Sequence, residues 1–321
     1  MLASTFPSYP LEQVVLDELH DAIRAERDLW APQMSADGHW RLQPMGEGSL
    51  PGVAVTTFLP LKKLLLPPRE EIWNFRSGEY CTAQVSQAFA VVGVPLCDLQ
   101  AVWYLDQAFA DDLPYQARRA QALLVGMACV PGPECRCDGL SMPLAGDLVI
   151  DHERVWVLSP AGQALLRACG CQVSQELPLP WPVVATGKRR ALTQERFFST
   201  TEAAIWTDEA KRCLSCGACS AVCPTCYCFD MLDAAALDGS VTRHRLWDNC
   251  FFAEHGKVAG DYDFRPGRAN RLRFRMEHKR FGFGALRGQN SCVGCGRCRK
   301  VCPVDIDLDL IAEQLDGEGG S

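Results

Sequence analysis

Hydrophobic and polar positions in the first half of the chain form short runs that suit strands in some places and helices in others. Residues 52–67, GVAVTTFLPLKKLLLP, combine β-branched and apolar runs and predict strands. Residues 148–159, LVIDHERVWVLS, predict a β-hairpin that turns between Asp151 and Arg154. Strands are therefore expected in this half of the chain.

Apolar residues at helical spacing predict three helices in the same region. The segment 98–109 begins at a candidate N-cap, Asp98, and the segments 114–128 and 160–170 each open on a proline, which is favoured in the first turn of a helix. Helices and strands mixed in this way predict an α+β fold that starts with an N-terminal mixed α/β domain.

Prolines interrupt the pattern at residues 177–184, LPLPWPVV. Proline cannot continue a helix or a central strand, so this stretch is the predicted linker. We expect one domain over residues 1–184 and a second, cysteine-rich domain over residues 185–321.

Length and composition exclude several classes of protein. With 321 residues, 48% of them hydrophobic and 22% charged, the chain is long enough for two folded domains. It has no apolar run of about 18 residues, and its start lacks the regions of a signal peptide. We therefore expect a cytoplasmic protein without a membrane span. The net charge of -7 argues against general nucleic-acid binding.

Cysteine changes this picture most. The chain has 18 cysteines, and in a reducing compartment clustered thiols bind metal more often than they form disulfides. Two copies of the pattern C-x2-C-x2-C-x3-C-P occur. The first copy is Cys213, Cys216, Cys219 and Cys223, and the second is Cys292, Cys295, Cys298 and Cys302.

This spacing is typical of paired [4Fe-4S] clusters. Three cysteines at three-residue steps wrap one cluster, while the fourth points away toward the other cluster. The predicted ligands are Cys213, Cys216, Cys219 and Cys302 for cluster 1, and Cys292, Cys295, Cys298 and Cys223 for cluster 2. A zinc ribbon also uses C-x2-C pairs, but tetrahedral zinc gives no reason for the third cysteine or the proline.

The remaining cysteines fall into three groups. A third [4Fe-4S] cluster is predicted on Cys97, Cys129, Cys135 and Cys137, because the C-x-C pair lies on a Pro/Gly-rich loop with nothing obvious to bury it. Cys81, Cys169 and Cys171 are interpreted as packing residues. Cys226, Cys228 and Cys250 are reserve ligands or structural thiols.

A long insertion, about residues 225–290, separates the two motifs. Residues 265–280 within it hold seven Lys or Arg and one acid, and Arg271, Arg273 and Arg275 alternate with apolar residues as on a strand with one basic face. Positive charge beside an anionic cluster would favour its reduced form. A solvated face or a docking site for an acidic partner is the alternative.

Several words of the sequence resemble the iron–sulfur β subunit of NAD(P)-linked [NiFe] hydrogenases (sulfhydrogenases) and the related iron–sulfur subunit of anaerobic sulfite reductase. They are CLSCGACSAVCPTCYCFD, RLWDNCFF, FRPGRANRLRFRMEHK and CVGCGRCRKVCPVDIDL, and upstream CDLQAVWYLDQAF, DLPYQARR and ECRCDGLSM. Two departures concern the third site: Arg136 stands where the family usually has an aromatic residue, and Pro95 and Leu96 stand where it has a basic one.

The resemblance implies a two-cluster ferredoxin-like domain with a long insertion, in a protein that passes single electrons between a flavin/NAD(P)-binding partner and a [NiFe] hydrogenase. A sirohaem sulfite reductase partner is the alternative. The chain itself has no G-x-G-x-x-G fingerprint after a strand and no clustered acid–base residues, so we expect no nucleotide site and no catalytic residues. A structural or redox-sensing iron–sulfur protein is an alternative of another class.

Overall fold

The computed structural model describes residues 5–11, 13–46, 52–82, 87–137, 142–171, 175–179 and 192–317. The described residues divide into two compact units. The first unit takes them from 1–65, 84–133 and 137–185, and the second from 66–83, 134–136 and 186–321. The expected boundary at residue 184 lies outside the described residues, as does most of the predicted linker, of which 177 and 178 end a short strand.

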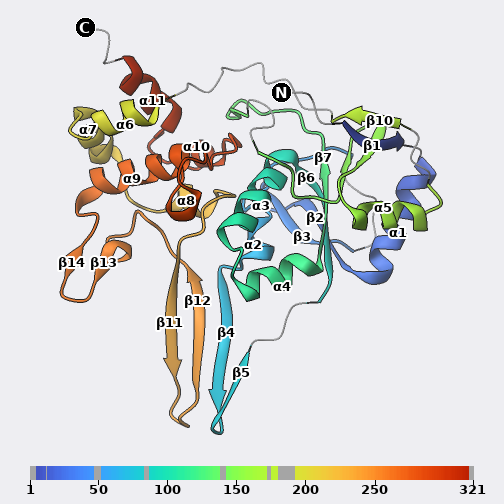
Figure 1. The fold of residues 1–321 in the computed structure, drawn as a ribbon, viewed down its shortest axis with the longest axis horizontal. Coiled ribbons are helices and arrows are strands. Elements are labelled where there is room, and N and C mark those ends of the chain that lie inside the picture. The colour runs from blue at the N-terminus through green and yellow to red at the C-terminus, as the bar shows by residue number, and fades with distance from the viewer. Residues whose placement is uncertain are drawn as a thin grey trace. The chain divides into compact units, whose positions relative to one another are not determined.

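Within the described residues of the first unit, eight strands form a mixed sheet in the order β10-β1-β9-β8-β7-β6-β2-β3 (Figure 1). They are β1 (Thr5–Pro10), β2 (Asp28–Met34), β3 (Trp40–Pro44), β6 (Phe89–Pro95), β7 (Ala122–Met127), β8 (Leu148–Ile150), β9 (Arg154–Val157) and β10 (Gln175–Pro178). The central strands β2, β6, β7 and β8 pair in parallel. Every residue of β6 is buried, as expected of a strand in the middle of a parallel sheet.

Helices of the first unit pack on this sheet. They are α1 (Gln13–Glu26), α2 (Lys62–Leu65), α3 (Leu96–Ala108), α4 (Leu113–Gln121) and α5 (Pro160–Ala168). Leu19 and Ile23 of α1 and Leu166 of α5 join sheet residues in one buried cluster. The first unit is thus a mixed α/β layer structure, as predicted for the N-terminal domain.

Two of the local predictions are confirmed. The hairpin around Asp151 to Arg154 is present, with β8 and β9 paired antiparallel. The helix predicted after Pro160 is α5, whose N-cap Ser159 accepts a hydrogen bond at Oγ from the backbone N–H of Gly162 over 3.1 Å. The helix predicted over 98–109 also exists, but it begins at Leu96, and Asp98 is buried in its first turn instead of capping it.

Two other predictions are wrong. Residues 52–67 form no strand among those described; they run as a loop into the short helix α2, because prolines at 60 and 67 remove N–H groups that a ladder needs. The helix predicted over 114–128 ends at Gln121. The apolar residues that follow form β7, since a place in the buried centre of the sheet overrides their helical spacing.

The second unit contains a sheet with strand order β11-β12-β4-β5 among its described residues. The strands are β4 (Arg69–Arg76), β5 (Glu79–Thr82), β11 (Phe229–Ala235) and β12 (Val241–Trp247), with a separate pair β13 (Lys257–Val258) and β14 (Tyr262–Asp263). The helices are α6 (Gln194–Ser199), α7 (Ala204–Arg212), α8 (Ala218–Ala221), η1 (Glu254–Gly256), α9 (Gly267–Phe281), η2 (Gly284–Leu286), α10 (Arg297–Lys300) and α11 (Leu308–Gly317).

The sheet of the second unit joins segments that are far apart in the sequence, and Figure 1 shows the hairpin β4–β5 beside the hairpin β11–β12. Arg245 of β12 and Glu70 of β4 form a buried ion pair with Nη2 and Oε2 2.6 Å apart. Trp247 donates a hydrogen bond from Nε1 to the carbonyl oxygen of Leu66 over 2.8 Å. These contacts explain why residues 66–83 belong to the cysteine-rich unit.

The basic stretch is a helix, so its prediction as a strand is wrong. It forms α9, which places Arg271 and Arg275 one turn apart and buried, while Arg273 lies on another side and donates to Oγ1 of Thr201 over 3.1 Å. Leu272 and Met276, also one turn apart, enter the core of the second unit. Five alternating residues cannot distinguish a strand from a helix when both faces are partly buried.

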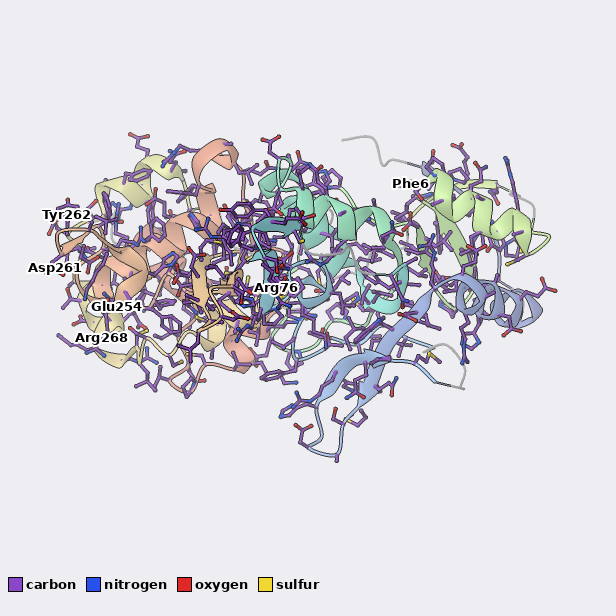
Figure 2. The ribbon with its side chains drawn as sticks, turned by 90° about the horizontal axis from the view of Figure 1, so that it is seen from below. Phe6, Arg76, Glu254, Asp261, Tyr262 and Arg268 are labelled. Atoms are coloured by element: carbon purple, nitrogen blue, oxygen red, sulfur yellow. The ribbon has the colours of Figure 1, made fainter. Side chains whose placement is uncertain are left out.

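The segment between β12 and α9 carries exposed side chains. Glu254, Asp261, Tyr262 and Arg268 point outward from it in Figure 2. None of the helices in the described ranges combines the length and apolar character of a membrane-spanning segment.

Candidate iron–sulfur centres

The two cysteine motifs have matching backbones. In each, the glycine after the second cysteine has a positive φ, +76° at Gly217 and +74° at Gly296, and each caps a short helix, α8 or α10. Two residues before these glycines, Ser215 and Gly294 also have positive φ. Helices α8 and α10 pack against each other. The equal spacing in the sequence thus produces two equivalent loops.

Glycine is required at both caps by space as well as by φ. A Cβ at Gly217 would lie 2.4 Å from Nδ2 of Asn249, which donates to the carbonyl oxygen of Gly217 over 2.8 Å. A Cβ at Gly296 would lie 2.5 Å from the carbonyl oxygen of Glu134. Each loop is therefore held closely by a segment from elsewhere in the sequence.

A first cavity, of about 530 Å³ including its opening to solvent, lies among these loops. Its cysteines are Cys213, Cys216, Cys219, Cys298 and Cys302. Apolar side chains of Phe251, Leu272 and Ile306 complete much of the wall. The first motif thus supplies three of these thiols, and Cys302 comes from the end of the second.

A second cavity, of about 600 Å³ measured in the same way, has a more charged wall. Its cysteines are Cys223, Cys292, Cys295 and Cys298. Here the second motif supplies three thiols and the first supplies its last cysteine. The two cavities therefore share the two motifs crosswise, which is the arrangement that paired [4Fe-4S] clusters require.

Backbone donors point at two of the cysteine sulfurs in the first cavity. The N–H of Ser215 donates to Sγ of Cys213 over 3.4 Å, and the N–H of Ile306 donates to Sγ of Cys302 over 3.3 Å. Such hydrogen bonds stabilise a thiolate over a thiol. Hydrogen bonds to the sulfurs also help to set the reduction potential of a bound cluster.

Arg275 lines both cavities and is buried. It donates from Nη1 to Oγ of Ser220 over 2.8 Å and to Sγ of Cys226 over 3.3 Å, and from Nη2 to the carbonyl oxygen of Cys219 over 3.0 Å. Burial alone would lower the pKa of this guanidinium, but nearby thiols, Cys219 first, hold its pKa well above the usual value. Arg275 is therefore a permanent cation between the cavities.

Lys279, one helical turn further along α9, lines the second cavity and is also buried. Its Nζ donates to Oγ1 of Thr225 over 2.8 Å. Burial lowers the pKa of this ammonium, but the thiols of Cys223 and Cys226 outweigh burial and raise the pKa.

Among the described residues, no carboxylate forms an ion pair with Arg275 or Lys279. Buried charges in proteins are normally paired. A [4Fe-4S] cluster held by four thiolates is an anion, so the donor set, the backbone N–H groups and these two cations together fit such a group.

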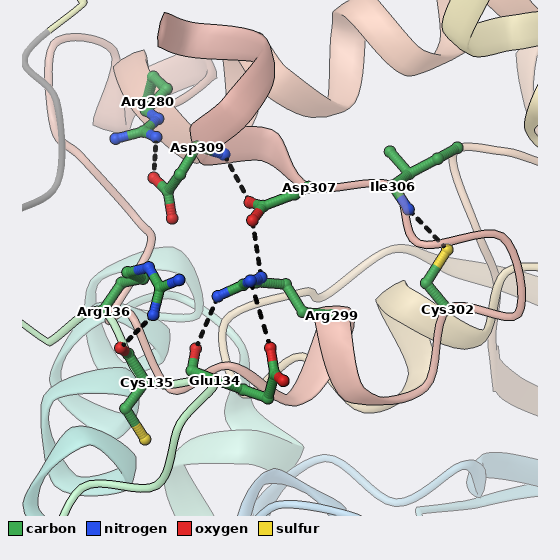
Figure 3. A network of polar contacts seen from close by, with 9 residues as sticks. All are labelled: Glu134, Cys135, Arg136, Arg280, Arg299, Cys302, Ile306, Asp307 and Asp309. Carbon is green, nitrogen blue, oxygen red and sulfur yellow. Dashed lines mark hydrogen bonds and ion pairs between the residues drawn. The ribbon is translucent and has the colours of Figure 1, made fainter. Parts of the chain in front are cut away.

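The loop 134–136 closes one side of the second cavity, within the second unit (Figure 3). The N–H of Arg136 donates to the carbonyl oxygen of Gly294 over 2.7 Å. Arg299 binds Oε2 of Glu134 over 3.4 Å and Oδ2 of Asp307 over 2.7 Å. Beside it, Arg280 pairs with Asp309, whose N–H donates to Asp307. Sequence analysis missed this network, because nothing in the local sequence links residue 134 to residue 299.

The residues of the third predicted site are divided between the units. Cys97, Cys129 and Cys137 belong to the first unit, where Cys97 and Cys137 are buried and Cys129 packs on the core. Cys135 belongs to the second unit, where its Sγ donates to the carbonyl oxygen of Cys295 over 3.9 Å. The third cluster stays a prediction.

The other cysteines have distinct environments. Cys169 and Cys171 pack against the core of the first unit, as interpreted from the sequence. The interpretation of Cys81 as a packing residue is wrong, because its side chain is exposed on the narrow strand β5. Cys228 and Cys250 lie in and against the core of the second unit. In the described part of the chain, no three His, Cys, Asp or Glu side chains surround a position for a single metal ion.

Comparison with known proteins agrees with the cysteine-lined cavities. Residues 212–306 match a family model described as a 4Fe-4S dicluster domain. The chain is therefore an iron–sulfur protein of the two-cluster class. It is 31% identical to Sulfhydrogenase 2 subunit beta of Pyrococcus furiosus over 292 residues, which cover 81% of this chain and 84% of that protein.

The chain belongs to the family of hydrogenase-type iron–sulfur β subunits, which confirms the resemblance inferred from its sequence words. No solved structure matches it.

Proposed function

We propose that this protein is an electron-transfer subunit that passes single electrons through [4Fe-4S] clusters held in the two cavities. The observation that carries the proposal is the crosswise sharing of the two cysteine motifs between two adjoining cavities, with the buried cation Arg275 in the wall of both. In this assignment Cys213, Cys216, Cys219 and Cys302 hold cluster 1, and Cys223, Cys292, Cys295 and Cys298 hold cluster 2.

The bound clusters supply the redox chemistry, because each changes charge by one unit. The protein's own residues hold them and set their electrostatic environment. Backbone N–H groups stabilise the thiolates, and Arg275 and Lys279 neutralise part of the negative charge. Cys298 lines both cavities and places the two sites side by side. We assign the third predicted site, on Cys97, Cys129, Cys135 and Cys137, to a further cluster.

We assign the protein to a multisubunit hydrogenase complex, between a flavin/NAD(P)-binding partner and a [NiFe] hydrogenase partner. The family and the name of the relative, a sulfhydrogenase β subunit, support this assignment. The absence of a nucleotide-binding fingerprint from the sequence is consistent with a partner that binds the nicotinamide. A complex that contains a sirohaem protein and lacks nickel would overturn the choice of hydrogenase partner.

The test uses the complete complex, purified without oxygen, with Cys219→Ala in this chain. Electron transfer from H₂ to NAD(P)⁺ should fall more than tenfold, because cluster 1 loses a ligand. Oxidation of H₂ with an artificial acceptor, which can take electrons directly from a hydrogenase partner, should be retained. The subunits must still copurify, and iron should fall by about four per chain.

Full electron transfer to NAD(P)⁺ in a variant that lacks cluster 1 would overturn the electron-transfer function. That outcome would favour a structural or sensing role for the clusters.

A further inference from the structure

Two cysteines outside both cavities are brought together by the hairpin β11–β12. Cys228 directly precedes β11, and Cys250 follows β12 by three residues. The strands pair Phe229 with Trp247, and the ladder continues one step, because the N–H of Asp248 donates to the carbonyl oxygen of Cys228 over 3.0 Å. The two thiols hydrogen-bond to each other at the base of this hairpin.

The pair is asymmetric. Cys250 is 4% exposed and forms part of the core, while Cys228 is only partly buried. The hydrogen bond from the Cys250 thiol lowers the pKa of Cys228 to about 7, and the charge of Lys279 adds to this effect, against burial and Asp248. The same hydrogen bond raises the pKa of Cys250. An accessible thiolate in front of a buried thiol is the arrangement found in reactive dithiols.

We propose that Cys228 and Cys250 form a redox-active dithiol that exchanges with low-molecular-weight disulfides. The Cys228 thiolate attacks one sulfur of the small disulfide, whose S–S bond breaks and releases one thiolate with the electron pair. Cys250 then gives up its proton and attacks Sγ of Cys228, and the second small thiolate leaves. Two protein thiols are oxidised by two electrons, and the small disulfide is reduced to two thiols, which take up the two protons.

The assignment follows from what surrounds the pair. Neither cysteine lines either of the two cavities, so neither is needed as a cluster ligand there. Cys226, close by in sequence, contacts Arg275 instead. The ladder contact at Asp248 fixes the two segments, so the thiols stay in register without reorganisation of the chain.

The experiment uses the full-length holoprotein, purified without oxygen and treated with oxidised glutathione. Remaining thiols are blocked with N-ethylmaleimide, and peptides are mapped by mass spectrometry. We expect a disulfide between Cys228 and Cys250 with unchanged iron content. In Cys250→Ser this disulfide should disappear, at least a tenfold loss of signal, and Cys228 should carry a glutathione adduct instead.

Cys81 provides the matched control, because it is an exposed thiol on β5. It should form a glutathione adduct without an internal disulfide, and Cys81→Ser should leave the Cys228–Cys250 product unchanged. Iron content and the dithionite-reduced EPR spectrum show whether each variant is folded. The proposal is overturned if Cys228 and Cys250 are recovered only as maleimide adducts, or if the disulfide forms only as iron is lost.

Discussion

Arg275 donates a hydrogen bond to the carbonyl oxygen of Cys219, so a buried cation is fixed to the first cysteine motif and lies in the wall of both cavities. Helix α9, which carries Arg275, is part of the insertion between the motifs. The insertion therefore supplies charge to the cluster sites as well as a sheet.

Arg275→Gln should lower the midpoint potentials of both clusters. The reduced cluster carries one more negative charge, and loss of a unit charge several ångströms away in a medium of effective dielectric about 20 corresponds to a shift on the order of 100 mV. A redox titration followed by EPR measures it. Arg275→Lys keeps the charge and should recover most of the potential.

Arg273→Gln is the matched control, because Arg273 stacks on Phe197 and donates to Thr201 away from the cavities. It should leave both midpoints unchanged. Equal shifts in the Arg275 and Arg273 variants would contradict the electrostatic role of Arg275. Unchanged midpoints in both, with weaker binding of the protein partners at high salt, would favour the docking alternative for the basic stretch.

Cys223→Ala should remove the cluster of the second cavity, although Cys223 belongs to the first motif. The reason is that Cys223 lines the cavity with Cys292, Cys295 and Cys298. Iron should fall by about four per chain, and the EPR signal that Cys292→Ala abolishes should be the one lost. Loss of the signal that Cys216→Ala abolishes would instead place Cys223 at the first site.

Gly296→Ala should destabilise the second site more than backbone strain alone explains. A left-handed residue other than glycine costs about 1–2 kcal/mol, and here the new Cβ would also meet the carbonyl oxygen of Glu134. Gly288→Ala is the control, since Gly288 has a positive φ and nothing within 4 Å of an added Cβ. Thermal melts and iron content should show a larger loss for Gly296→Ala; equal losses would exclude the clash.

Glu70→Gln should destabilise the second unit by about 3–5 kcal/mol, because it leaves the buried guanidinium of Arg245 without its carboxylate. Denaturant unfolding monitored by circular dichroism measures the change. Asp233→Asn removes the partner of Arg243 in an exposed ion pair on the same sheet and should leave the midpoint nearly unchanged. A similar effect of the two substitutions would show that burial of the pair is unimportant.

Alkylation of Cys228 by iodoacetamide should accelerate as the pH rises through about 7, because the thiolate is the nucleophile and the pKa of Cys228 is lowered to about 7. Cys250→Ala removes the hydrogen bond responsible, so the pKa should return toward its ordinary value of about 8.5 and the rate at pH 7 should fall roughly tenfold. Lys279, which lowers this pKa, and Asp248, which raises it, remain in the variant. Quantitative mass spectrometry gives the rates; an unchanged profile would contradict the assigned cause.

The sequence by itself determined the parts of this protein that depend on short-range spacing. Cysteines at three-residue steps with a glycine after the second fix the shape of a loop, because the constraint acts within about ten residues. For the same reason the hairpin at Asp151 to Arg154 and the helix after Pro160 were predictable. The family could also be inferred, since its sequence words occur in order.

Only the tertiary structure decided which distant segments complete these loops. Residues 66–83 and 134–136 join the cysteine-rich unit through a buried ion pair and a backbone hydrogen bond to Gly294, and no local signal announces either contact. The basic stretch is a helix because Leu272 and Met276 are buried on one side of it, so Arg275 and Lys279 face the cavities. Burial and long-range pairing depend on the whole chain, and a window of a few residues does not contain them.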